Sequence, residues 1–161
     1  MKIVLLGAAL ALSLSTVSAI SANIVETAKG AGTFGTLLAA AQAAGLADAL
    51  ATGQNLTVFA PTDEAFAKLP AGTVDELLKP ENKDKLAAIL SYHVLPRQLA
   101  ANQIPAGPIH VRTIKAGGDR TLAISKGADG VTVDNAKVIS ADIKADNGII
   151  HIIDSVMLPK S

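Results

Sequence analysis

The spacing of apolar and polar positions changes halfway along the chain. In the first half, apolar residues recur at the three- and four-residue intervals of a helix, as Leu86, Ile89 and Leu90 do, and His93 continues the same face. After Pro108 the interval becomes two, which returns side chains to the same face of a strand. Because helices come first and a series of strands follows, the pattern predicts an α+β fold with an antiparallel sheet or sandwich.

Cap and turn signals divide this pattern into elements. Predicted helices begin near Asn23, Thr33, Thr62, Thr73 and Asn82, and the side-chain oxygens of the last four can cap a first turn. Predicted strands cover residues 56–60, 109–114, 121–125, 131–133, 136–143 and 149–153. The pair Asn147-Gly148 precedes the last strand and is the usual signal of a tight β-hairpin.

The first residues have the pattern of an export signal. Lys2 precedes an uncharged apolar run, and Val17-Ser18-Ala19 fits a signal-peptidase site. We expect residues 1–19 to be a signal peptide and residues 20–161 to be one mature domain; cleavage after Ala22 is the alternative. An uncleaved anchor would need the uncharged run to span a bilayer, but its second half is rich in serine. The protein is therefore expected to be secreted or periplasmic, with no membrane span after cleavage.

Composition and motifs exclude several classes of protein. The chain has 14 basic and 14 acidic residues and no cysteine, which disfavours nucleic-acid binding, a disulfide scaffold and a thiolate metal site. There is no Gly-x-Ser-x-Gly elbow and no phosphate-binding loop. The three histidines lie on separate predicted elements without the spacing of metal ligands. The sequence therefore predicts a protein that is not an enzyme and has no cofactor or metal.

Three segments, in this order and separation, resemble the fasciclin domain family. They are Thr-Val-Phe-Ala-Pro-Thr-Asp-Glu-Ala-Phe at 57–66, Leu-Ser-Tyr-His-Val-Leu-Pro at 90–96 and Asn-Gly-Ile-Ile-His-Ile-Ile-Asp-Ser-Val-Met-Leu-Pro at 147–159. Their structural positions are Thr57, Phe59, Pro61, Thr62, Phe66, Asn147, Gly148, His151 and Asp154. The resemblance runs from about Asn23 to Pro159.

The resemblance implies both a fold and a function. The fold is a wedge-shaped β-sandwich with helices packed along one edge. The function is cell adhesion or contact with extracellular matrix, without a typical catalytic activity. A single domain with a signal and no cysteine is similar to the secreted bacterial branch of the family.

The resemblance also implies two partner-binding motifs. In animal members they are a Tyr-His pair and an Asp-Ile pair, matched here by Tyr92-His93 and Asp142-Ile143. The residues themselves favour another role for the first pair, because His93 lies on an apolar stripe and a buried imidazole must be hydrogen-bonded. We expect His93 to tie its helix end to the sheet and Tyr92 to pack mainly in the core. For Asp142, contact with a partner and capping of the following turn both remain open.

Two functional hypotheses follow. The first is a secreted adhesion domain that binds a cell-surface or matrix protein, or a glycan, non-covalently. The alternative is a secreted or periplasmic carrier of a small apolar or polysaccharide ligand, which needs a pocket lined by aliphatic side chains. With three Phe and one Tyr as its aromatics, the chain has few rings to stack on sugars, which counts against a glycan ligand.

Overall fold

The computed structural model describes residues 22–115, 118 and 120–158, so the predicted signal lies outside the described residues. The helices are α1 (Ile24–Ala31), α2 (Gly35–Ala43), α3 (Ala47–Thr52), α4 (Asp63–Ala67), α5 (Thr73–Leu77) and α6 (Lys83–Tyr92), with short 3-10 turns η1 (Pro80–Asn82) and η2 (Ala101–Gln103). The strands are β1 (Leu56–Pro61), β2 (Val94–Leu95), β3 (Gly107–Arg112), β4 (Thr121–Gly127), β5 (Gly130–Val133), β6 (Ala136–Ala145) and β7 (Gly148–Ile153). No helix in this part of the chain is long and apolar enough to cross a membrane.

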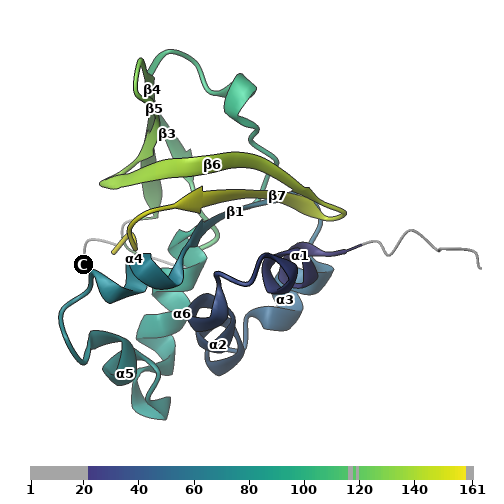
Figure 1. Cartoon of the computed structure of the whole chain (residues 1–161). Coiled ribbons are helices and arrows are strands. Elements are labelled where there is room, and N and C mark those ends of the chain that lie inside the picture. Colours follow the sequence, from purple (N-terminus) through teal and green to yellow (C-terminus); the bar gives the residue numbers. More distant parts are fainter. Residues whose placement is uncertain (1–21, 116–117, 119, 159–161) are drawn as a thin grey trace, which may run out of the picture.

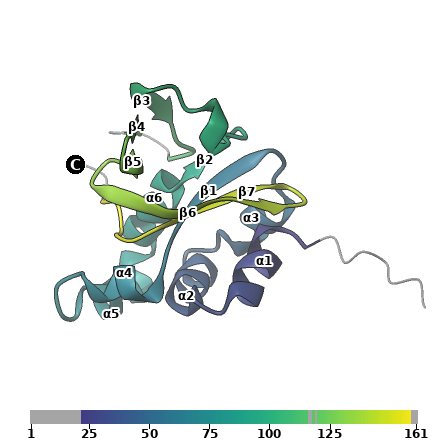
Figure 2. The ribbon, with the colours of Figure 1, turned by 45° about the horizontal axis from the view of Figure 1, so that its top comes forward.

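The strands form one seven-stranded sheet in the order β2-β1-β7-β6-β5-β4-β3. Its two edges approach each other, because the Ile114 amide just after β3 donates to the Val94 carbonyl of β2 at 2.9 Å. The sheet is therefore nearly closed into a barrel. The helices lie on one side of β1, β6 and β7, and β3–β5 lie on the other (Figures 1 and 2). The predicted α+β class is confirmed.

One strand pair departs from the antiparallel sheet that the sequence predicts. β1 and β7 are parallel, in register from Leu56 opposite Gly148 to Pro61 opposite Ile153. Parallel neighbours need a long crossover, and here the chain between them contains α4–α6 and five strands. The expectation of an antiparallel sheet is wrong for this pair, because sequence periodicity does not report strand direction.

Two apolar clusters fill the interior, and β1 separates them. The helix-side cluster contains Val58 and Ala60 of β1 with apolar residues of α1, α2, α3 and α6. The barrel-side cluster contains Phe59 of β1 with residues of β3–β7. Because alternate side chains of a strand point to opposite faces, neighbouring residues of β1 enter different clusters. This explains the continuous apolar character of β1, which is covered on both faces.

Some predicted helix caps form and others do not. The Thr62 side chain accepts from a first-turn amide of α4, as predicted, and Asn23 does the same for α1, where the sequence predicted the helix but not its cap. Thr33 does not cap α2; that role falls to Asp63, whose Oδ1 accepts from the Thr36 amide at 2.8 Å. Thr73 and Asn82 also fail as caps, because α5 starts after Gly72 in a left-handed conformation and Asn82 Nδ2 instead donates to the Glu76 carbonyl.

The turn between β6 and β7 uses its Asn-Gly pair differently from a standard hairpin. Ala145 pairs with Gly148, so the turn residues are Asp146 and Asn147, and neither of them nor Gly148 has a positive φ. Glycine is required at position 148 because there is no room for a side chain. A Cβ there would collide with the Leu56 carbonyl oxygen and crowd the Ile24 side chain.

Candidate partner-binding site

Tyr92 is the last residue of α6, and its ring lies in the barrel-side cluster. The side chain is 2% exposed. Its hydroxyl lies 2.7 Å from Oδ2 of Asp134, in the β5–β6 turn, and 3.1 Å from the Thr121 carbonyl oxygen. Tyr92 therefore joins the end of α6 to the β5–β6 turn and to the start of β4. A partner outside the protein cannot reach this ring without displacing those elements.

His93 follows Tyr92 and points the other way, into the helix-side half of the molecule. It is 2% exposed, and both ring nitrogens are engaged. Nε2 accepts from the Met157 backbone N–H at 3.0 Å, which leaves the ring proton on Nδ1 to be donated to the Ile89 carbonyl at 2.7 Å. The sequence predicted a link from the helix end to the sheet; the link instead holds the segment after β7.

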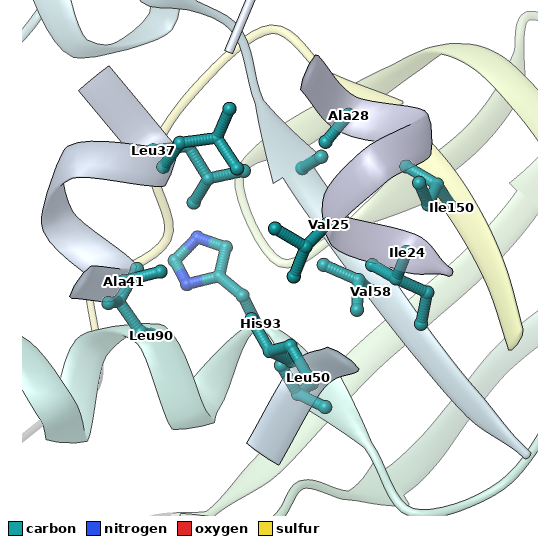
Figure 3. Close-up of a pocket in the computed structure, with 13 residues that line it drawn as sticks. Ile24, Val25, Ala28, Leu37, Ala41, Leu50, Val58, Leu90, His93 and Ile150 are labelled. Atoms are coloured by element: carbon teal, nitrogen blue, oxygen red, sulfur yellow. The ribbon is translucent and has the colours of Figure 1, made fainter. Parts of the chain in front are cut away.

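The His93 ring borders a small apolar cavity among α1, α2, α3 and α6 (Figure 3). The cavity measures about 30 Å³, and its other walls are aliphatic side chains such as Val25, Leu37 and Ile150. Burial in these surroundings lowers the pKa of His93 to about 4, although the bond to Ile89 opposes the shift. His93 is therefore a neutral, structural side chain at neutral pH.

His151 of β7 forms a second buried link, on the barrel side of the sheet. Its Nε2 donates to the Leu99 carbonyl at 2.6 Å, and its Nδ1 accepts from the Asp142 amide at 3.2 Å. The ring stacks on Phe59 with 5.5 Å between centroids. Burial lowers the pKa of His151, so this side chain too is neutral at neutral pH. His151 thus holds the backbone of β6 at Asp142, where the regular pairing of β6 with β7 is interrupted.

Asp142 is the exposed member of the four residues matched to partner-binding motifs. Its backbone has a φ of 59°, unusual for a non-glycine residue, at an irregularity in the β6–β7 register. Its Oδ1 accepts from the Ala101 amide of η2 at 2.8 Å, so it caps η2 rather than the following turn. No described residue bonds the other carboxylate oxygen. Ile143 is half-buried against the helix-side cluster.

The two motifs therefore do not form one surface. Tyr92 and His93 are buried, whereas Asp142 is exposed and Ile143 is half-buried. Sequence reasoning missed Asp134, the partner of Tyr92, and Asp63, the cap of α2. Asp134 has a left-handed φ of 51°, and its position in Asp134-Asn135 between two strands was the available signal.

Other motif residues hold loops and helix ends. Thr57 Oγ1 donates to the Arg97 carbonyl at 2.7 Å and accepts from the Leu99 amide at 2.8 Å. Asp154 accepts from the Lys137 amide at 2.9 Å, and this bond keeps the pKa of its carboxyl below the usual value. Both residues fasten segments that follow strands. Pro61, Phe59 and Phe66 are buried or end a strand, as packing positions do.

Asn147 makes the largest set of side-chain bonds among these motif residues. Its Nδ2 lies within hydrogen-bonding distance of the carbonyls of Leu50, Ala51 and Gly53 at the end of α3. Its Oδ1 accepts from the Ile24 amide at the start of α1, at 2.9 Å. One buried side chain thus satisfies the ends of two helices.

The fold is an α+β domain with a nearly closed sheet that helices cover on one side. Buried tyrosine and histidine side chains hydrogen-bond its separate segments to one another. The family model described as Fasciclin domain matches residues 32–159, so the chain belongs to the fasciclin domain family. Protein sll1483 of Synechocystis sp. is 52% identical over 85% of this chain and 73% of its own length. The transforming growth factor-beta-induced protein ig-h3 of Sus scrofa is 41% identical over 85% of this chain, which spans 19% of that protein.

A solved structure supports the fold independently. The FAS1 domain pair from the insect cell adhesion molecule fasciclin I superposes with a TM-score of 0.71 over 85% of this chain, at 19% sequence identity. The chain spans about half of that structure, covering 51% of it. At this identity the likeness concerns the fold, and it confirms the fasciclin-like architecture that the sequence predicts.

Proposed function

We propose that the protein is an exported adhesion domain that binds a cell-surface or matrix protein without chemical reaction. The observation that carries the proposal is Asp142, which is exposed although one hydrogen bond holds its carboxylate and a second holds its backbone amide. Its Oδ1 accepts from Ala101 and its amide donates to His151, so the carboxylate is presented in one position. A preorganised polar group loses less entropy on binding than a freely rotating one.

Tyr92 and His93 support this surface from inside, in our proposal. Tyr92 holds the β5–β6 turn that precedes β6, and His93 holds the segment that follows β7. Both therefore act on the strand pair that carries Asp142-Ile143. A substitution at either position would therefore affect binding only where it disrupts the fold, and a variant that stays folded should still bind.

The carrier hypothesis receives less support. The apolar cavity beside His93 measures about 30 Å³, and a neighbouring one lined by Leu46, Leu56 and Ile114 measures about 80 Å³. Ligand pockets typically have several hundred Å³. An open cleft beside Ile139 reaches about 320 Å³, but its other walls are glycine, threonine and carboxylate residues rather than the aliphatic side chains that an apolar ligand needs. Catalysis is also not proposed, since both nitrogens of His93 and of His151 are occupied by backbone groups.

A pull-down with the mature domain tests the proposal. The immobilised domain is incubated with cell-surface or matrix material, beside an unrelated secreted domain of similar charge. Asp142→Asn removes the charge but keeps an oxygen for the Ala101 amide, and Asp146→Asn makes the same change at an exposed position in the nearby turn. We expect Asp142→Asn alone to lose binding. Equal capture by the domain and the unrelated control would refute adhesion.

Export is tested separately by expressing the full chain. The proposal predicts a mature protein outside the cytoplasm that starts at Ile20, or at Asn23 if cleavage follows Ala22. Mass spectrometry of the cell-free fraction measures this start directly. A full-length chain that remains with the cytoplasm would contradict export.

A further inference from the structure

We propose that the middle of β6, residues 138–142, accepts an extended segment of the partner as an added β strand, and that this segment carries basic side chains. The inference rests on the proposed adhesion function and names its mode and its partner chemistry. In strand addition, main-chain hydrogen bonds supply affinity, and alternate side chains supply specificity.

β6 is longer than the strand beside it. β7 pairs with β6 from Val138 to Ala145, but β5 pairs only with Ala136 and Lys137. Beyond Lys137, no strand of the described chain pairs with β6 on the β5 side. In Figure 1, β3, β4 and β5 gather at one end of β6, and the rest of β6 runs beside β7. An edge of this kind presents backbone donors and acceptors to another strand.

Two register irregularities in β6 shape this open stretch. They fall between Val138 and Ser140 and between Ser140 and Ile143. Bulges re-aim the side chains next to them. Here Ile139 is 57% exposed, the most exposed large apolar side chain described, and Asp142 projects its carboxylate at the far end. η2 reaches β6 at Asp142, so the open stretch is short.

The chemistry beside Ile139 indicates what binds there. Ile139 forms one wall of an open cleft of about 320 Å³, whose other walls come from Gly32, Thr33, Thr62, Asp63 and Glu64. The cleft has two carboxylates and no basic side chain. The Thr36 amide keeps the pKa of Asp63 below its usual value, so that carboxylate stays charged.

Carboxylates therefore lie at both ends of the open stretch, with Asp63 and Glu64 near Ile139 and Asp142 at the other end. A lysine or arginine fits the first end, because its aliphatic stem can lie on Ile139 while its charge reaches Glu64. The exposed Lys137 and Lys144 flank the stretch and repel further basic residues. The segment that fits is short, extended and basic at alternate positions.

Two synthetic peptides test this mode on the mature domain. One alternates valine and lysine, and the other has glutamate in place of lysine. We expect the lysine peptide to bind and to slow hydrogen exchange of amides within residues 138–141, since the Asp142 amide is already bonded to His151, while the glutamate peptide does neither. Protection elsewhere without protection of these amides, or equal binding of both peptides, would overturn the inference.

A substitution in β6 tests whether the peptide and the natural partner bind the same site. Ile139→Lys removes the apolar wall and adds repulsion, and Leu158→Lys makes the same kind of change at another exposed site, 52% exposed. We expect Ile139→Lys to lower the affinity for both the lysine peptide and the captured surface material by about tenfold or more. Leu158→Lys should change neither affinity. Circular dichroism establishes that both variants are folded.

The outcomes separate this inference from the proposed function. If surface material binds the wild type and Ile139→Lys equally, adhesion stands and strand addition is overturned. If the wild type captures nothing, both fail. If the wild type dimerises in sedimentation and Ile139→Lys does not, the edge is occupied by a second copy, and a basic partner segment is overturned.

Discussion

Single buried polar residues hold together parts of the chain that lie far apart in sequence. His93 joins α6 to Met157, and His151 joins β7 to Leu99 and to β6. In each case the histidine meets backbone groups on both sides of its ring. A buried backbone group without a partner costs free energy. Losing one such side chain therefore destabilises the fold by more than the net contribution of the hydrogen bond.

Replacing His93 by alanine is expected to lower the free energy of unfolding by about 1–3 kcal/mol, because the Ile89 carbonyl and the Met157 amide lose their partner. Urea denaturation measures the change. His110→Ala is the matched control, since His110 is exposed on β3. If His93→Ala unfolds like the wild type, the structural role of His93 is wrong.

Acid should destabilise the domain through the same residue. Burial lowers the pKa of His93 from its ordinary value of 6.5 to about 4 in the folded protein. Between these values the unfolded chain binds a proton that the folded chain does not, so stability is lost as the pH falls. At 1.36 kcal/mol per pH unit, the loss is about 3 kcal/mol at pH 4, and it levels off within about one unit below that pH, where the folded protein is protonated too.

Urea denaturation at pH 7 and at pH 4.5 tests this pH dependence. His151 is shifted in the same direction and adds to the loss. Replacing His93 by alanine should therefore flatten the slope without abolishing it. An identical slope in wild type and variant would show that His93 is protonated equally in both states.

Among the elements, β6 combines structural and exposed positions along one strand. Its first residues belong to the β5 ladder, and its later residues contact only β7 on the described ladders. The side chains of β6 still alternate between the two faces across the irregularities: Val138 packs on the barrel side, and Ile143 packs on the helix side. Asp142 is exposed because it lies on the outer part of this strand.

Gly148→Ala tests how closely β1 and β7 approach. A methyl group there meets the Leu56 carbonyl oxygen, so we expect a loss of about 1–3 kcal/mol in unfolding free energy. Gly30→Ala is the control, because a Cβ at Gly30 in α1 meets nothing within 4 Å. That change should stabilise the domain by up to about 1 kcal/mol. Equal effects of the two substitutions in thermal or urea unfolding would contradict the close approach.

How far the sequence predicts these elements depends on the range of the interactions. Asn23 and Thr62 cap their own helices, and such local bonds are readable from sequence. Asp63 caps α2 from 27 positions away, and Asn147 caps α1 and α3 from the far end of the chain. Long-range caps, strand direction and the open edge of β6 depend on the tertiary arrangement, which periodicity does not contain.

At the scale of the whole molecule, the fold places most motif residues in the interior and one of them, Asp142, at the surface. The fasciclin motifs at Thr57, His93 and His151 lie inside and fasten loops to the sheet. The exposed Asp142 lies on the strand pair that they hold. The sequence resemblance found all of these residues without separating interior from surface, but the helical spacing placed Tyr92 and His93 inside, where the structure has them.

The central claim is that a partner contacts Asp142 and not the Tyr92 hydroxyl. The most direct test compares the binding of two folded variants, Tyr92→Phe and Asp142→Asn, to the same captured surface material. We predict that Tyr92→Phe binds within about twofold of the wild type, and that Asp142→Asn binds about tenfold more weakly, the equivalent of about 1.4 kcal/mol. Loss of binding in folded Tyr92→Phe, with full binding in Asp142→Asn, would contradict the account.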